Sequence, residues 1–85
     1  MKSLLDILKE EKELVRRFNS QSDAIDLFEE QLERIRNLDV DCKVKEDNIN
    51  YYEVLIEEYQ CAILETTREL DKVRLEIRNY FKELL

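Results

Sequence analysis

Carboxylates and cysteines are the side chains of this 85-residue chain that could do chemistry, because it contains no histidine. The acids closest to a metal motif are Asp39 and Asp41, which are spaced like the first two ligands of a calcium loop. That loop also needs glycine at its sixth position and glutamate at its twelfth, where this chain has Val44 and Asn50. Asp39 and Asp41 are therefore predicted to be turn and capping residues, and no metal site is expected.

Catalytic groups are equally few. Histidine is the commonest general acid–base residue, and phosphate-binding loops require glycine, but the chain has neither. Cys42 and Cys61 are too few for a zinc site, which takes four ligands, so we expect them to behave as small apolar residues. The sequence predicts a protein that is not an enzyme and that carries no cofactor.

Charge and composition narrow the class of partner. The chain has 14 Lys+Arg against 21 Asp+Glu, a net charge of −7, whereas nucleic acid and anionic membranes attract basic surfaces. No apolar run approaches the ~20 residues of a membrane span, and no signal peptide is evident. We therefore expect a cytoplasmic protein with no direct binding to nucleic acid or membrane.

The composition predicts helices. Hydrophobic residues make up 44% of the chain and charged residues 41%, and glycine and proline are absent. This mixture is typical of long amphipathic helices.

Two long helices are predicted to position any site. In the first half of the chain, apolar residues recur at the a and d positions of a heptad that counts Leu4 as a, after a possible capping box of Ser3 and Asp6. The polar d residue Gln21 interrupts the pattern within the polar stretch 19–23. The heptad keeps its phase across this stretch, which favours one continuous helix; the alternative is a three-helix arrangement with a break near 19–23.

The second half carries a cleaner heptad that counts Ile49 as a. Thr66 is the single polar residue among its eleven a and d positions over 49–84. This heptad is three residues out of phase with the first, and the aspartates and asparagines between the two favour a turn. Asp47 or Asn48 would cap the second helix, and Asn37, which tolerates the left-handed conformation better than most residues, would end the first.

The predicted fold is accordingly an all-α, coiled-coil-like helical hairpin. A single domain over 1–85 would consist of a helix over about 3–38, a turn over about 39–47 and an antiparallel helix over about 48–84. A chain this short buries only about 60% of the surface that it exposes when unfolded, so a hairpin alone is marginal. We therefore expect a homodimer that completes a helical bundle, or a different protein partner of unknown identity.

The interface residues are predicted from the same heptads. The assembly seam would be formed by residues of the second helix, with residues of the first helix opposite: Ile56, Tyr59, Ile63, Leu70, Val73 and Ile77, with Phe18, Ile25 and Phe28. An external partner would contact the apolar residues of the second helix that lie off its a and d positions: Val54, Cys61, Leu64 and Leu75.

The predicted function is protein binding, as a small acidic adaptor or chaperone that shields a partner helix. An alternative is an acidic inhibitor that imitates nucleic acid and occupies the basic groove of a target protein.

A short stretch of the second half suggests a third alternative. Thr67-Arg68-Glu69-Leu70-Asp71-Lys72-Val73 resembles the Ser-x-x-Leu-Asp segment of the small two-helix aspartyl-phosphate phosphatases of sporulating bacteria. Thr67 stands where that family has serine, and the first-helix portion has no counterpart at the expected distance. The resemblance implies a phosphatase-like regulator, whereas the heptad explains Leu70 as an a position.

Overall fold

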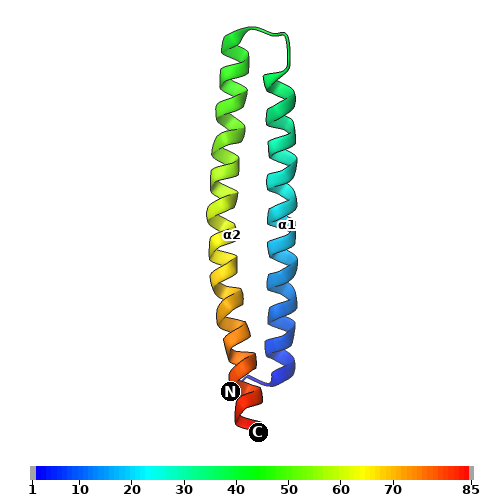
Figure 1. Ribbon diagram of the computed structural model, residues 1–85, viewed down its shortest axis with the longest axis vertical. Helices are drawn as coiled ribbons and strands as arrows, with labels where there is room; N and C mark the ends of the chain where they lie inside the picture. The colour runs from blue at the N-terminus through cyan, green and yellow to red at the C-terminus, as the bar shows by residue number, and fades with distance from the viewer. Residues whose placement is uncertain (1, 85) are drawn as a thin grey trace.

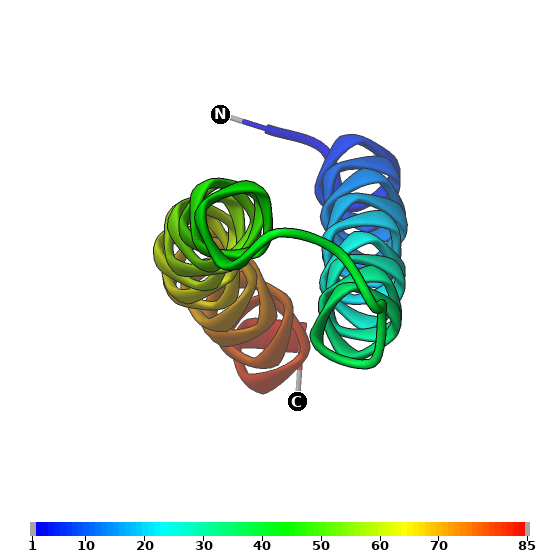
Figure 2. The same cartoon turned by 90° about the horizontal axis from the view of Figure 1, so that it is seen from above.

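The protein is an antiparallel hairpin of two long helices. The computed structural model describes residues 2–84, in which α1 spans Leu4–Arg36 and α2 spans Cys42–Leu84. The helices lie side by side, with the turn at one end of the molecule and both chain termini at the other (Figure 1). Seen from above, they are inclined to each other (Figure 2), and the rod measures 65 × 16 × 14 Å. The all-α hairpin is confirmed; the two ends of the predicted domain 1–85 lie outside the described residues.

α1 begins and continues for the reasons that its sequence suggests. The Ser3 hydroxyl oxygen accepts a hydrogen bond from the Asp6 backbone N–H at 3.2 Å, which satisfies one of the unpaired donors of the first turn. The helix runs unbroken through 19–23, so the alternative three-helix arrangement is wrong. A constant heptad phase keeps Phe18 and Ile25 on the same side of α1, where both are half-buried.

The C-terminus of α1 is capped at Asn37, as expected. Its backbone N–H donates to the carbonyls of Glu33 and Arg34, both at 3.2 Å. The expected left-handed conformation is wrong, because Asn37 has φ −92° and ψ −2°. Among residues 2–84 no φ is positive, so the chain reverses direction without needing glycine.

The turn is shorter than predicted, because α2 begins at Cys42 rather than near 48. An Asp41 side-chain oxygen accepts from the backbone N–H of Lys43 at 3.3 Å, and the Asp41 carbonyl accepts from that of Lys45 at 3.1 Å. Asp41 is therefore the N-cap, and the prediction of Asp47 or Asn48 for this role is wrong. Both lie inside α2, where the Asn48 amide donates back to the Val44 carbonyl at 2.7 Å.

Burial along the seam between the helices is uneven. Near the termini, Ile7, Leu14, Leu70 and Val73 form a cluster of buried apolar side chains. In the half near the turn, Leu32 is the single buried apolar residue within the described chain. That half is filled by half-buried side chains, including the ring of Phe28, which lies 5.2 Å from the ring of Tyr59 and 6.1 Å from that of Tyr52. Two helices alone therefore leave the turn half of the seam incompletely covered.

A polar layer crosses the middle of the seam. The Thr66 side chain is only 3% exposed, and its hydroxyl lies 2.9 Å from the Gln21 side-chain oxygen and 3.0 Å from the Ala62 carbonyl. The two polar d residues of the heptads thus face each other. Since each satisfies the other, neither breaks its helix.

Candidate functional site

The residues predicted for the assembly seam lie between α1 and α2. Leu70 and Val73 are buried, and the other seven predicted seam residues are half-buried: Phe18, Ile25, Phe28, Ile56, Tyr59, Ile63 and Ile77. Their apolar contacts therefore serve mainly to hold the hairpin together. What a partner could reach is the rim of this seam and the outer faces of the helices.

The four residues predicted for an external partner are all exposed. Val54, Leu64 and Leu75 are 53%, 59% and 52% exposed, and Cys61 is exposed as a free thiol. Val54, Cys61 and Leu75 occupy the f position of the α2 heptad, directly opposite the seam, whereas Leu64 is at b. These residues are spread along and around α2, so they do not form one compact patch.

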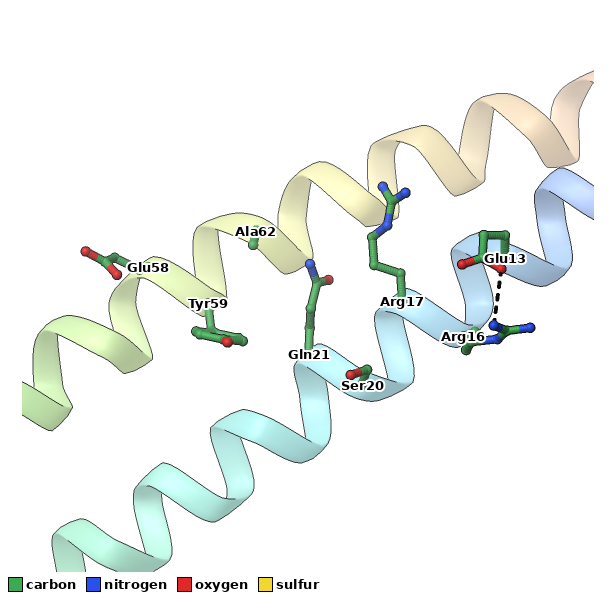
Figure 3. Close-up of a pocket in the computed structure, with 8 residues that line it drawn as sticks. All are labelled: Glu13, Arg16, Arg17, Ser20, Gln21, Glu58, Tyr59 and Ala62. Carbon is green, nitrogen blue, oxygen red and sulfur yellow. Dashed lines mark ion pairs between the residues drawn. The ribbon is translucent and has the colours of Figure 1, made fainter.

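A groove along one side of the seam contains a hollow near the middle of the rod. This central hollow, of about 540 Å³, lies between α1 and α2 and has Arg17, Gln21, Glu58 and Ala62 in its lining. Figure 3 shows Gln21 and Tyr59 reaching into the space between the helices from opposite sides, with Glu58 at the α2 edge. Because Ala62 has a short side chain, it leaves room for a neighbouring side chain at this point.

A second hollow lies on the outer face of α2, nearer the turn. This turn-side hollow, of about 450 Å³, is formed by residues of α2, among them Asp47, Tyr51, Val54, Leu55 and Glu58. The two hollows share Glu58. These two hollows meet at Glu58, where the surface passes from the seam onto the outer face of α2, and we call them together the acidic groove.

Charges differ between the two parts of the acidic groove. In the central hollow, Arg17 pairs with Glu69 of α2 at 3.3 Å, and Arg16 pairs with Glu13 at 3.6 Å (Figure 3). In the turn-side hollow, Asp47 and Glu58 have no ion-pair partner within residues 2–84. The net negative charge of the groove is therefore concentrated near the turn.

The other side of the seam carries a separate hollow near the middle of the rod. It has a volume of about 330 Å³ and includes Val15, Phe18, Thr67, Leu70 and Arg74 in its lining. Val15 and Thr67 are e residues of their heptads, whereas Arg17 and Ala62 of the acidic groove are g residues, and e and g flank a seam on opposite sides. We call this second surface the apolar hollow.

The titratable side chains of residues 2–84 are mostly spread over exposed faces of the helices. No group of three or more potential metal ligands occurs over the described span 2–84. The hydrogen bond from Lys2 to Glu10, at 2.9 Å, and the charge of Glu10 raise the pKa of Lys2. That pair is exposed and lies near the termini, away from the central and apolar hollows. The arrangement is suited to contact with another macromolecule, through apolar anchors and a charged edge.

Sequence reasoning missed most of the acidic groove. Of its turn-side residues, Val54 alone was among the predicted interface residues, whereas Asp47, Tyr51, Leu55 and Glu58 were not. A signal was available, since 47, 51, 54 and 58 are spaced by four, three and four residues and so share one helix face. It was hidden because 39–47 was assigned to the turn, which removed Asp47 from α2.

Neither α1 nor α2, over residues 2–84, combines the length and the apolar character needed to cross a membrane. Comparisons with protein-family models, with curated proteins and with solved structures found no match to this chain.

Proposed function

We propose that this protein is a non-enzymatic interaction module, a small acidic adaptor or chaperone that binds an α-helix of a partner protein. The observation that carries the proposal is the incomplete cover of the hairpin. Within the described chain only five apolar side chains are buried, whereas Tyr51, Val54, Leu64 and Leu75 are each more than half exposed. An added helix would bury such side chains and complete a three-helix bundle.

Helix-against-helix packing explains how binding would work. A hairpin presents a groove on each side of its seam, and an amphipathic helix fills such a groove with side chains three and four residues apart. The apolar anchors supply most of the affinity, since they are removed from water. The acids at the edge set the selectivity, because they attract basic side chains and repel acidic ones.

A homodimer is the second part of the proposal, and it would use the apolar hollow. Val15, Phe18 and Leu70 line this surface. Two hairpins packed there would form a four-helix bundle, which is the usual support for a chain this short. Sedimentation equilibrium should show a dimer at micromolar concentration, and Val15→Lys should convert it to a monomer. A folded wild-type monomer at that concentration would refute the dimer.

Site-specific crosslinking tests the binding function. A photoreactive residue at Tyr51, in the acidic groove, is expected to capture a partner from the native host. The same residue at Asp26, which is exposed and lines none of the hollows between the helices, should not capture that partner. Identical capture profiles from the two positions would contradict a groove-bound partner.

The free thiols of Cys42 and Cys61 are in keeping with the proposed cytoplasmic location.

Imitation of nucleic acid is the alternative function. The observation in its favour is the number of exposed α2 acids without an ion-pair partner among residues 2–84, which include Asp47, Glu57, Glu58 and Glu65. Apolar side chains, Tyr51 and Val54, lie between Asp47 and Glu58, which favours a helix as the ligand. A salt titration of the isolated complex distinguishes the two functions. Mimicry should lose affinity steeply between 50 mM and 200 mM salt, by roughly 10³-fold, whereas apolar helix packing should lose much less.

A further inference from the structure

The side of the seam that carries the apolar hollow holds a second, larger hollow nearer the turn. It has a volume of about 780 Å³ and includes the a residues Leu32 and Ile56 in its lining. Glu29 and Glu53, which also line it, are e residues of their heptads. The apolar hollow is bounded by e residues too, so both hollows open on one side of the rod. We call this side, formed by the e and b residues of both helices, the e face.

Charge is divided along the e face. The polar layer of Gln21 and Thr66 separates a turn half from a terminal half. In the turn half, acids outnumber bases at the e and b positions: Asp26, Glu29, Glu33, Glu46, Glu53 and Glu57 against Arg36 and Lys43. In the terminal half, bases outnumber acids at these positions: Lys12, Arg74 and Arg78 against Asp71. The e face is therefore acidic toward the turn and basic toward the termini.

Ion pairs within the chain leave this division in place. Arg36 pairs with Glu53 at 3.4 Å, and Arg74 pairs with Glu11 at 3.2 Å. Several exposed charges of the e face have no ion-pair partner among residues 2–84: Glu29, Glu33 and Glu57 in the turn half, and Lys12 and Arg78 in the terminal half. These are the charges that a molecule bound to the e face could neutralise.

A second copy of this chain supplies the complementary charges in one orientation. Two copies related by a two-fold axis present the same face to each other. An axis that runs along the rods would put both turns at the same end and would place acidic half on acidic half. An axis that runs across the rods would put the turns at opposite ends and would place each acidic half on a basic half. Electrostatic complementarity favours the second arrangement.

The spacing of the charges fits a single axis across the rods. In this arrangement each helix packs antiparallel against the same helix of the other copy. Lys12 and Glu29 are then opposite each other if the axis passes α1 midway between them, and Arg78 and Glu57 are opposite each other if it passes α2 midway between them. Both midpoints fall within two residues of the polar layer, so they lie at about the same level of the rod. One axis therefore satisfies both helices.

Apolar side chains lie close to this axis. The apolar hollow is on its terminal side and would face the layer of Ile25 and Ile63 in the other copy, two a residues that the hairpin leaves half-buried. The rod is 65 Å long and 16 Å wide, so one face offers on the order of 1,000 Å², whereas a stable complex buries about 800 Å² on each partner. Because the axis crosses the middle of the seam, the two rods would overlap along their whole length.

We infer that two copies of this chain pair through the e face with their turns at opposite ends, so that Glu29 and Glu57 of each copy lie against Lys12 and Arg78 of the other. This inference rests on the proposed function, since it names the face and the orientation of the proposed homodimer.

Charge reversal tests the contacts between the two copies. Glu29→Lys/Glu57→Lys places basic side chains against the basic half of the other copy, and Lys12→Glu/Arg78→Glu places acidic side chains against its acidic half. Each double variant should raise the dissociation constant of the dimer, measured by sedimentation equilibrium, at least about tenfold. The first variant also brings the net charge of −7 closer to zero, so general repulsion between copies would not explain its loss.

Matched variants locate the effect on the e face. Asp23→Lys/Glu65→Lys makes the same charge change at exposed f and c positions outside this face, and it should alter the dissociation constant less than about twofold. An equimolar mixture of the two e-face variants should associate at least as tightly as the wild type, because opposite charges meet again at every contact. The chain that carries all four e-face substitutions should recover the homodimer. Circular dichroism melting of each variant verifies that the hairpin is intact.

Spin labels determine the orientation of the two copies. With Cys42 and Cys61 replaced by serine, a single label at position 47 should give a distance between copies of roughly 60 Å, because each label lies about 20 residues from the axis. Turns at the same end would bring these labels within about 40 Å. A label at position 68, beside the axis, should give a distance below about 40 Å in either arrangement and serves as the control. Double electron–electron resonance measures both.

The outcomes separate the inference from the proposed function. A dimer whose labels at position 47 lie within about 40 Å would overturn the inference and leave the proposed homodimer standing. Equal dissociation constants for Glu29→Lys/Glu57→Lys and for Asp23→Lys/Glu65→Lys would also overturn the inference. A folded wild-type monomer at micromolar concentration would overturn both the inference and the homodimer. The binding of a partner helix would still be judged by crosslinking from Tyr51.

Discussion

The Thr66 hydroxyl lies 2.9 Å from the side-chain oxygen of Gln21, in the middle of the seam and between residues 45 positions apart in sequence. A hydroxyl has one proton, so Thr66 donates either to Gln21 or to the Ala62 carbonyl of its own helix at any moment. Sliding α1 against α2 by one turn would leave both polar side chains against apolar ones. This pair therefore favours a single register of the antiparallel helices.

Removing the hydroxyl tests the polar layer. Thr66→Val is expected to lower the free energy of unfolding by about 1 kcal/mol, because Gln21 loses a partner in a half-buried place. Adding Gln21→Leu should restore most of this stability, since two apolar groups can pack together. Urea unfolding of both single variants and the double variant gives the coupling energy, and strictly additive effects would contradict the interaction.

The N-cap of α2 offers a second test. Asp41→Ala should destabilise the protein by about 1 kcal/mol, because the Lys43 backbone N–H loses its acceptor. Asp47→Ala is the control, since Asp47 lies inside α2, and it should change the stability by less than about 0.5 kcal/mol. Thermal melting followed by circular dichroism measures both. A larger loss for Asp47→Ala would mean that α2 begins later.

A pair of leucines on α2 tests the position of the core. Leu70 is 8% exposed and belongs to the buried cluster, whereas Leu75 is 52% exposed. Leu70→Ala should cost about 3 kcal/mol, which is a large part of the stability of so small a domain, whereas Leu75→Ala should cost less than about 0.5 kcal/mol. Urea midpoints compare them directly. Similar midpoints for the two variants would show that the seam has been assigned to the wrong face.

Spin labels measure the chain reversal. With Cys42 and Cys61 replaced by serine, labels at positions 5 and 82 should lie within about 30 Å of each other, because packed helix axes are about 10 Å apart. A single continuous helix would separate these positions by roughly 115 Å. Double electron–electron resonance distinguishes the two, and a long distance within one chain would rule out the hairpin.

The fold was predictable because both helices carry long, regular heptads. The change of phase between Leu4 and Ile49 pointed to a turn, and the constant phase around Gln21 pointed to an unbroken α1. These signals come from many residues acting together, so one polar interruption does not erase them.

The start of α2 was not predictable, because several residues could cap it. Asp41, Asp47 and Asn48 are all good caps, and the first turns of α2 carry little apolar seam to choose among them. Lys45, at a d position, is half-buried and reaches the Arg36 carbonyl of α1 with its ammonium at 3.2 Å. A lysine that satisfies the end of another helix is invisible to a search for apolar repeats.

The acidic groove was only partly predictable, for a related reason. Tyr51 and Val54 can be read from the sequence as apolar residues off the seam. Their relation to Asp47 and Glu58 depends on α2 extending back to Cys42. An error of less than two helical turns in one boundary therefore concealed the charge pattern of the surface.

The uneven burial of the seam has a consequence for how the hairpin opens. Local unfolding requires less free energy where few apolar side chains leave the core. Among the described residues near the turn, Leu32 is the one buried apolar side chain. The helix segments next to the turn should therefore exchange their amide hydrogens faster than the segments around Leu14 and Val73. α1 and α2 are thus packed together more firmly near the termini than near the turn that connects them. A ligand bound near the turn would therefore stabilise the segment that opens most often by local unfolding.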